Sequence, residues 1–246
     1  MGIYTCELLA VVDETPTVRT IRLRRPADLD FVPGQFCLIS FVGESDFVGV
    51  KKPFTFSSSP TTAETFDLTI KKMEGFTTAL FSLDVGQELL IEGPYGELLN
   101  FDGSSKKDLV LIAGGSGVAP FMSFIDFVVD KKLTNKVLLF NSNRTAGEII
   151  FRDRLAKVAE MNKNVDVVTV LTRENTCTGN DVCGRINVEL LKKYVPDVSN
   201  KEWYVCGPTS LVRGLRDIIL ELGVTPNYIH YEVWQLPGKS DLEVEK

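Results

Sequence analysis

The spacing of apolar residues changes near residue 100, and this change constrains the fold more than any other feature. Before it, short runs such as 65–72 (TFDLTIKK) alternate apolar and polar side chains, which is the period of a strand with one buried face. Turn residues separate the runs, as in "PGQ" before 36–42. Many short strands divided in this way predict an antiparallel barrel or sandwich over residues 1–102.

After a polar, Gly/Ser-containing linker at 100–108, the rhythm becomes that of alternating strands and helices. Nearly continuous apolar runs are typical of parallel strands covered on both faces. Amphipathic helices are predicted between them. The strand candidates are 109–115, 136–143, 165–172, 203–208 and 228–234, and the helix candidates are 118–129, 148–161 and 209–223. This alternation predicts a doubly wound parallel α/β sheet over 103–234. A C-terminal tail follows at 235–246, and its residues leave both a disordered and an ordered tail open.

Composition excludes several classes of protein. The chain has 246 residues, of which 44% are hydrophobic and 24% charged, as in a globular protein with an ample core. No apolar run approaches the roughly 18 residues of a membrane span, and the N-terminus lacks a signal-peptide pattern. The net charge of −6 and the pI of about 5.0 argue against general nucleic-acid binding.

Cysteine and histidine are too few and too scattered for most metal or hydrolytic chemistry. The five cysteines form no CxxC pair, and one histidine leaves a zinc or iron–sulfur site without ligands, so no metal is expected. An odd, scattered count of cysteines fits a reducing cytoplasm, which is the location we predict. His230 lies within an apolar run and is expected to be a packed or partly exposed strand residue rather than a catalytic base.

Two glycine-containing loops carry the clearest signs of chemistry. Residues 113–120 (AGGSGVAP) follow the first parallel strand, and Gly115 and Gly117 have the spacing of a dinucleotide loop, although Pro120 replaces the third glycine. A plain tight turn is the structural alternative. The fourth strand ends in "CGP" at 206–208, and the two loops are expected to be neighbours at the switch point of the sheet. Cys206 is there either as a site residue or as a small buried side chain.

Over residues 3–234 the chain resembles the ferredoxin-NADP reductase superfamily, on motifs in the family's order. "PGQF" (33–36) is similar to a strand-opening turn, "KPFTFSS" (52–58) to the flavin signature, and "GFTT" (75–78) to the phosphate segment. "GGSGVAP" resembles the nicotinamide-nucleotide loop, "CGP" the segment beside the nicotinamide, and "EVW" (232–234) the closing Glu-x-aromatic. The resemblance implies an N-terminal antiparallel Greek-key β-barrel for flavin and a C-terminal domain for the nicotinamide nucleotide.

The resemblance also implies the roles of individual residues. Thr55 would lie at the flavin N5, Cys206 beside the nicotinamide, and Glu232 would orient the pair; these three are the expected catalytic residues. Phe54 would provide an apolar wall and Lys52 a charge for the phosphate. The other implied cofactor-binding residues are Pro53, Thr69, Ile70, Lys71, Gly75, Thr77, Thr78, Gly114, Gly115, Gly117, Val118, Pro120, Asn143, Arg144, Gly207, Pro208 and Trp234. For Thr77 and Thr78, helix N-capping is a compatible alternative.

Three departures from the family pattern affect these expectations. Lys52 replaces an arginine and Phe54 a tyrosine, so we predict flavin binding that is weakened but not abolished. Trp234 corresponds to the aromatic residue that stacks on the flavin, but twelve residues follow it, which puts a gating role in doubt.

The four arginines in 19–26 are expected to be a solvated barrel face, with carrier docking or an adenylate contact as the alternative.

The predicted function is hydride transfer from NADPH or NADH to FAD, or to FMN in its place, followed by electron transfer to a ferredoxin- or flavodoxin-type acceptor. The alternatives are an electron-transfer subunit of a larger oxidoreductase or hydrogenase-type complex, an NAD(P)H:flavin reductase, and a binding module that has lost its flavin. The nucleotide preference, the acceptor and the oligomeric state cannot be read from the residues.

Overall fold

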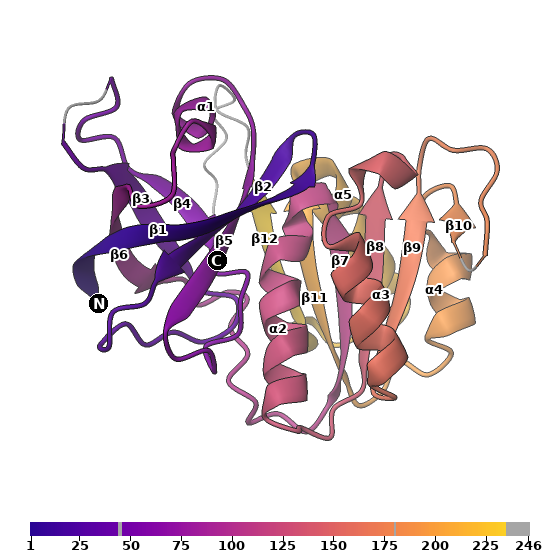
Figure 1. Cartoon of the computed structure of the whole chain (residues 1–246). Helices are drawn as coiled ribbons and strands as arrows, with labels where there is room; N and C mark the ends of the chain where they lie inside the picture. Colours follow the sequence, from indigo (N-terminus) through magenta and orange to yellow (C-terminus); the bar gives the residue numbers. More distant parts are fainter. Residues whose placement is uncertain (44–45, 180, 235–246) are drawn as a thin grey trace.

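The computed structural model describes residues 1–43, 46–179 and 181–234. It places two bodies side by side: a barrel built from the first part of the chain and a layered α/β body built from the second (Figure 1). The two predicted architectures are therefore confirmed. The predicted boundary at residue 102 remains a prediction, because residues on both of its sides pack in the same core.

The N-terminal body is a nearly closed antiparallel barrel. Its strands are β1 (Gly2–Thr15), β2 (Val18–Arg24), β3 (Phe36–Phe41), β4 (Lys52–Thr55), β5 (Thr65–Lys71) and β6 (Glu88–Tyr95), in the spatial order β4-β3-β6-β1-β2-β5. An isolated bridge between Phe56 and Leu68 joins the two ends of this order. The short helix α1 (Phe76–Phe81) directs Phe76 and Leu80 into the barrel core. The alternating pattern seen in 65–72 is explained by this core, because Phe66, Leu68 and Ile70 all point into it.

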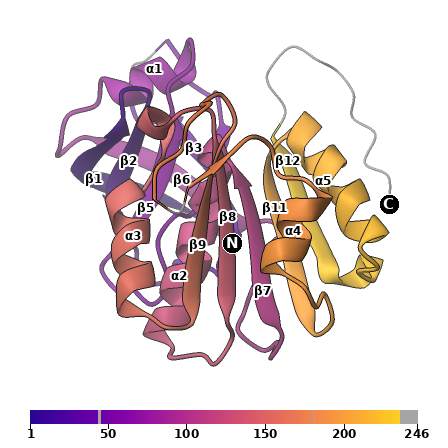
Figure 2. The same ribbon diagram turned by 90° about the vertical axis from the view of Figure 1, so that its right-hand side faces the viewer.

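The C-terminal body is a parallel six-stranded sheet between two layers of helices. Its strands are β7 (Asp108–Gly114), β8 (Val137–Asn143), β9 (Val165–Leu171), β10 (Val182–Cys183), β11 (Lys201–Pro208) and β12 (Ile229–Trp234), in the order β10-β9-β8-β7-β11-β12. The helices are α2 (Ala119–Asp130), α3 (Arg152–Met161), α4 (Val188–Tyr194) and α5 (Thr209–Glu221), with 3-10 turns η1 (Gly115–Val118), η2 (Ala146–Glu148) and η3 (Pro226–Tyr228). Helices α2 and α3 cover one face, and α4 and α5 the other (Figure 2).

The two bodies share a packed interface in which α2 lies between the parallel sheet and the barrel. Val18 and Leu99 join the core of the α/β body, and Phe101 stacks on Phe124 with a centroid distance of 5.4 Å. The predicted linker therefore connects the two bodies but is itself anchored. The hydroxyl of Ser123, in α2, donates to the carbonyl of Ser58 at 2.7 Å, and both residues are buried.

We expect Ser123→Ala to destabilise the protein by about 1–2 kcal/mol, because it leaves the buried Ser58 carbonyl without its donor. Denaturant-induced unfolding would measure the change. Ser210→Ala, an exposed serine at the start of α5, provides the matched control and should change stability by less than about 0.5 kcal/mol. Equal stability of the two variants would contradict the inferred contribution of the hydrogen bond.

Arginine side chains of β2 and of the turn after it form hydrogen bonds and ion pairs with other residues of the barrel. Arg22 donates two 2.8 Å hydrogen bonds to the buried carboxylate of Asp67, and Arg24 pairs with Glu7. Arg25, whose side chain is 11% exposed, donates to the carbonyls of Leu29, Pro60 and Thr62. Arg22 and Arg24 are half exposed or more, as a solvated face requires, whereas Arg25 is largely buried. Internal pairing thus accounts for these guanidinium groups without an external anion.

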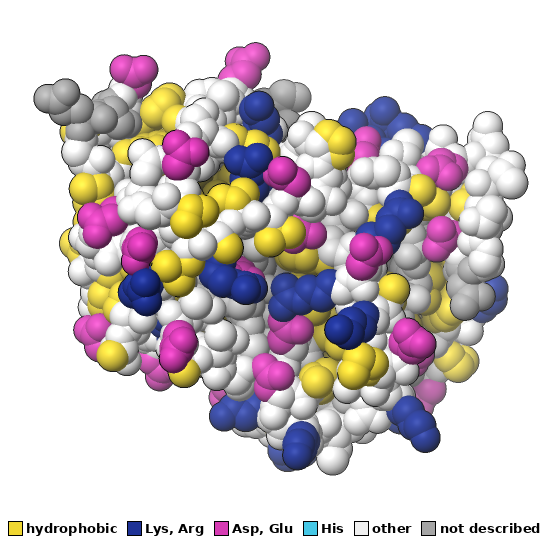
Figure 3. Space-filling model, in the orientation of Figure 1, with side chains coloured by type: hydrophobic (Ala, Val, Ile, Leu, Met, Phe, Trp, Pro, Cys, Tyr) yellow, Lys and Arg dark blue, Asp and Glu magenta, His cyan; other side chains and the backbone are white. Residues whose placement is uncertain are grey.

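On the face drawn in Figure 3, acidic and basic side chains are interspersed over both bodies, and neither kind forms a patch of its own. In the part of the chain that the structure describes, no helix combines the length and the apolar character needed to cross a membrane.

Candidate functional site

The glycine-rich loop after β7 lies directly against the loop that ends β11. Gly117 is so close to β11 that a Cβ atom there would lie 2.3 Å from the carbonyl oxygen of Cys206. A Cβ on Gly207 would lie 3.1 Å from Cα of Gly114. The strand order explains this contact, because the chain runs outward from β7 to β10 and then returns to β11 on the other side of β7. The two loops therefore meet at the switch point of the sheet, as the sequence predicted.

Different residues of this loop are exposed to different degrees. Gly115 has φ +54°, and the position of its absent Cβ is open space, so backbone there is accessible to a ligand. Such an accessible turn at the start of a helix fits a pyrophosphate. Val118 and Pro120 are buried, and Pro120 lies in the first turn of α2, where its missing N–H costs nothing. Both therefore shape the loop from the core side.

A row of side chains crosses the sheet just below this loop. In the parallel register, Glu232 of β12 is opposite Cys206 of β11, Cys206 is opposite Ala113 of β7, and Ala113 is opposite Asn141 of β8. Cys206 is fully buried and packs in the core on the α2 face. Burial raises the pKa of Glu232 to about 7. Two of the predicted catalytic residues, Cys206 and Glu232, are therefore adjacent, and the carboxyl group can hold a proton near neutral pH.

The carboxyl end of β8 contains polar side chains that are only partly satisfied. The amide of Asn143 donates to Oδ1 of Asn141 at 3.0 Å, and both residues are buried. Nδ2 of Asn141 and Oδ1 of Asn143 lack hydrogen-bond partners among the described residues. The predicted residue Arg144 is half exposed, and its Nε lies 3.7 Å from a carboxylate oxygen of Glu148. Asn141 was not predicted, since a polar residue inside an apolar strand run carries no sequence signal of its own.

Thr55, the last residue of β4, is buried, yet its hydroxyl oxygen has no hydrogen-bond partner within the described residues. A buried hydroxyl without a protein partner is available to hydrogen-bond a bound group, and a ring nitrogen of a flavin is one group that would fit. Lys52 and Pro53 are exposed, and Phe54 is half-buried, with its ring stacked on Phe76 at 6.4 Å. Lys52 is therefore accessible to an anion, and Phe54 presents part of its ring.

A chain of buried hydroxyl groups runs through the interface beside Thr55. The hydroxyl groups of Ser57 and Thr69 are hydrogen-bonded to each other, as are those of Thr69 and Thr20, both at 2.9 Å. Thr20 donates to one oxygen of Glu14, whose other oxygen accepts the backbone N–H of Phe151 at the start of α3. The predicted residue Thr69 thus belongs to a chain of hydrogen bonds that reaches the α/β body through Glu14.

Ile70 and Lys71, which follow Thr69 in β5 and are also predicted site residues, have different surroundings. Ile70 points into the barrel core, so only its backbone can reach a cofactor there. Lys71 is exposed.

The phosphate segment 75–78 forms the start of α1. Gly75 is the N-cap residue with φ +73°, a conformation that favours glycine. The hydroxyl of Thr77 both accepts from the N–H and donates to the carbonyl of Met73, and the hydroxyl of Thr78 donates to the same carbonyl. The threonine side chains therefore close the turn before the helix. The N-cap residue is Gly75 and no side chain of the described residues caps the helix, so the N-capping alternative for Thr77 and Thr78 is wrong. The first N–H groups of the helix are the groups that remain for an anion.

Strand β12 ends the described part of the chain. The backbone of Trp234 is paired with Pro208 of β11, while its side chain and the tail 235–246 lie outside the description, as does the predicted stacking role of its indole. Pro208 is exposed at the end of β11. His230 stacks on Tyr204 with a centroid distance of 4.5 Å and is partly buried, so its prediction as a packed strand residue is confirmed.

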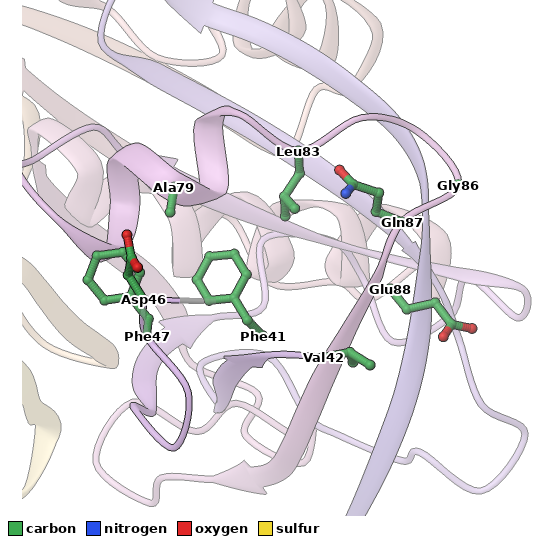
Figure 4. Close-up of a pocket in the computed structure, with 9 residues that line it drawn as sticks. All are labelled: Phe41, Val42, Asp46, Phe47, Ala79, Leu83, Gly86, Gln87 and Glu88. Atoms are coloured by element: carbon green, nitrogen blue, oxygen red, sulfur yellow. The ribbon is translucent and has the colours of Figure 1, made fainter. Parts of the chain in front are cut away.

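A separate cavity of about 540 Å³ lies beside α1, at the end of the barrel (Figure 4). Aromatic and aliphatic side chains form its walls, and carboxylates stand at its rim. It is lined by Phe41, Val42, Asp46, Phe47, Ala79, Leu83, Gly86, Gln87 and Glu88. None of these residues belongs to the predicted site.

Two matched family descriptions together cover most of the chain. Residues 6–99 match the Oxidoreductase FAD-binding domain, and residues 111–217 match the Oxidoreductase NAD-binding domain. Fold and domains thus define a two-domain oxidoreductase whose cofactors are FAD and a nicotinamide dinucleotide, in agreement with the prediction. The chain belongs to the ferredoxin-NADP reductase superfamily, as its motifs indicated.

The chain is similar to curated proteins and to solved structures. The chain is 28% identical to the glycine betaine monooxygenase reductase subunit of Chromohalobacter salexigens, over 94% of this chain and 64% of that protein. It is 27% identical to the sulfhydrogenase 2 subunit gamma of Pyrococcus furiosus, over 81% and 70%. A ferredoxin NADP+ reductase from Neisseria gonorrhoeae, solved with bound FAD and NADP, superimposes with a TM-score of 0.80 at 25% identity, over 95% and 99%. The chain thus spans less than two thirds of the length of the first of these relatives.

Proposed function

We propose that the protein is a flavoprotein reductase that takes hydride from NAD(P)H and passes electrons to a separate redox partner. One observation carries this proposal: the bond from Ser123 to the Ser58 carbonyl holds the segment after Thr55 against the helix that begins at the dinucleotide loop. The unpaired Thr55 hydroxyl and the Cys206–Glu232 pair therefore belong to bodies that meet at this interface.

When bound, FAD would accept a hydride from the nicotinamide and release electrons to the partner. The residues of the chain orient the reactants, which is the main requirement of such a transfer. The Thr55 hydroxyl is available to hydrogen-bond a flavin ring atom, and Lys52 together with the first amides of α1 would bind phosphate. Gly115 and Gly117 would bring backbone close to the pyrophosphate. Cys206 would limit the space at the nicotinamide, and Glu232 would hold a proton beside it.

The electron acceptor is proposed by class. Relatives are reductase components of oxygenases and a gamma subunit of a sulfhydrogenase, so a partner subunit or a small carrier of the ferredoxin or flavodoxin type fits this chain. The NAD(P)H:flavin reductase alternative remains compatible with the same site. The predicted domain limits, 1–102 and 103–234, and the cytoplasmic location are also kept as proposals.

The proposed function is tested by adding FAD or FMN to the protein and following anaerobic reduction by NADH and by NADPH in a stopped-flow instrument, with a panel of acceptors next. Rapid reduction of bound flavin supports the proposal. A protein that binds no flavin would overturn it in favour of a binding module that has lost its cofactor.

Because Lys52 provides a point charge and Phe54 lacks a hydroxyl, we expect flavin to dissociate on extensive dilution. Lys52→Arg should lower the flavin dissociation constant several-fold, since a guanidinium makes two directed bonds to phosphate. Fluorescence of the released flavin would report this. Stoichiometric flavin in the diluted wild-type protein would contradict the expectation.

Cys206→Ala is expected to slow hydride transfer about tenfold while flavin affinity changes little, because Cys206 lies in the α/β body and Thr55 in the barrel. Single-turnover reduction of the bound flavin measures the rate, and flavin titration provides the control. Unchanged single-turnover reduction would remove the proposed role of this side chain.

A further inference from the structure

Cys177 and Cys183 are joined by a disulfide, which the sequence analysis did not anticipate. Cys183 belongs to β10, which lies at one edge of the parallel sheet, and is exposed, whereas Cys177 is half-buried. The other three cysteines, Cys6, Cys37 and Cys206, are buried. Among the cysteines, the disulfide is thus the pair whose sulfur a reagent in solution can reach.

The chain just before Cys177 is bonded to the segment proposed to bind the nucleotide. The N–H of Thr172 donates to the carbonyl of Asn143, and the N–H of Arg173 donates to the carbonyl of Arg144, both at 2.9 Å. A carboxylate oxygen of Glu174 accepts the N–H of Ala146. Residues 143–146 are therefore held from the side by residues 172–174.

The other end of the cross-link is fixed to the sheet. Cys183 is paired with Leu171, and the N–H of Gly184 donates to the carbonyl of Leu171 at 2.9 Å. The disulfide thus ties the chain after Glu174 back to the point where β9 ends. Opening it removes a covalent limit on the positions of Arg173 and Glu174, so ordering them on a bound nucleotide costs more conformational entropy.

We propose that Cys177–Cys183 is a redox-sensitive site that sets the affinity of the protein for NAD(P)H. The reactant is a dithiol. Its thiolate attacks the exposed sulfur of Cys183, the S–S bond breaks, and Cys177 leaves as a thiolate that takes up a proton. The second thiol of the reductant then displaces Cys183, so two electrons and two protons pass to the protein and the reductant becomes a disulfide. The affinity arm of this inference rests on the proposed function.

The first test counts thiols in the denatured protein with Ellman's reagent, before and after treatment with dithiothreitol. Five cysteines with one disulfide give three thiols before reduction and five after it. Five thiols in protein that has been treated with a mild oxidant would overturn the proposal, whatever the protein binds.

The second test is calorimetric titration of the protein with NADPH and with NADH, in the oxidised form and after reduction and removal of the dithiol. We expect the dissociation constant to rise about tenfold on reduction, which corresponds to about 1.4 kcal/mol. The double variant Cys177→Ser/Cys183→Ser should bind as the reduced protein does and should not respond to dithiothreitol. Flavin affinity, measured on the same samples, should stay constant.

Hydrogen exchange gives a readout that needs no nucleotide. Amides of residues 143–146 are expected to exchange faster after reduction, while those of the barrel strand β5 keep their rates. Equal nucleotide affinity in the two redox forms would overturn this inference alone, whereas no binding in either form would overturn the proposed function as well.

Discussion

Replacing Gly117 by alanine is expected to destabilise the protein by about 3 kcal/mol and to displace the dinucleotide loop from β11. A Cβ atom at this position would lie 2.3 Å from the carbonyl oxygen of Cys206 and 2.8 Å from the backbone nitrogen of Gly207. Both are backbone atoms of a central strand, so neither can rotate out of the way. One of the two segments must therefore move, and the packing between η1 and β11 is lost.

Denaturant-induced unfolding followed by circular dichroism would measure this effect, and NADPH titration would show whether the displaced loop still binds. Gly214→Ala is the matched control, because Gly214 is an exposed residue within α5 with open space around its absent Cβ. Alanine there should stabilise the helix by up to about 1 kcal/mol. If Gly117→Ala unfolds within 1 kcal/mol of the wild type, the close approach of the two loops is not as tight as inferred.

Glu232→Gln is expected to change the pH dependence of stability. Burial raises the pKa of Glu232 from an ordinary value of 4.5 to about 7, so the folded protein binds this proton more tightly than the unfolded chain. Between pH 4.5 and 7 the stability contributed by this group therefore falls as pH rises, by a total of about 3 kcal/mol, and it is constant above pH 7. The neutral glutamine has no proton to lose, so the variant should gain relative to the wild type across this range.

The measurement is the difference in unfolding free energy between Glu232→Gln and the wild type, in flavin-free protein, at intervals from pH 4.5 to pH 8. Other titrating groups are common to both proteins and cancel in the difference. Glu221→Gln, at the exposed C-terminal end of α5, provides the reference for loss of a surface carboxylate. A flat difference between the two pH limits would mean that Glu232 is solvated and does not hold a proton at neutral pH.

The parts of the fold that could be predicted are those whose apolar pattern repeats. The strand candidates 109–115 and 136–143 correspond to β7 and β8, in which nearly every side chain is buried between two helix layers, and this gives continuous apolar runs. Strand β10 and helix α4 were missed, because they are short and the polar chain around them has no clear period. The pairing of Cys177 with Cys183 was also missed, since spacing alone does not determine which cysteines meet.

The candidate site was predicted unevenly for a similar reason. Loops at the ends of central parallel strands must meet, so the approach of Gly117 to Cys206 follows from topology. The roles of Thr77 and Thr78 depended on local hydrogen bonds, and the structure directs both hydroxyls to Met73. The Thr20–Thr69–Ser57 chain joins three separate parts of the barrel, and no local pattern could reveal it.

The anchoring of Phe101 in the α/β core bears on whether either half of the chain can fold by itself. A fragment that begins at residue 103 would lack Leu99 and Phe101, and it would expose the ring of Phe124 on which Phe101 stacks. A fragment that begins a few residues before Leu99 would keep the two side chains that cover this part of its core. Leu99 and Phe101 therefore precede the predicted domain boundary in the sequence, whereas their side chains are buried in the core of the second body. We expect the second half of the chain to fold by itself only as a fragment that includes both residues.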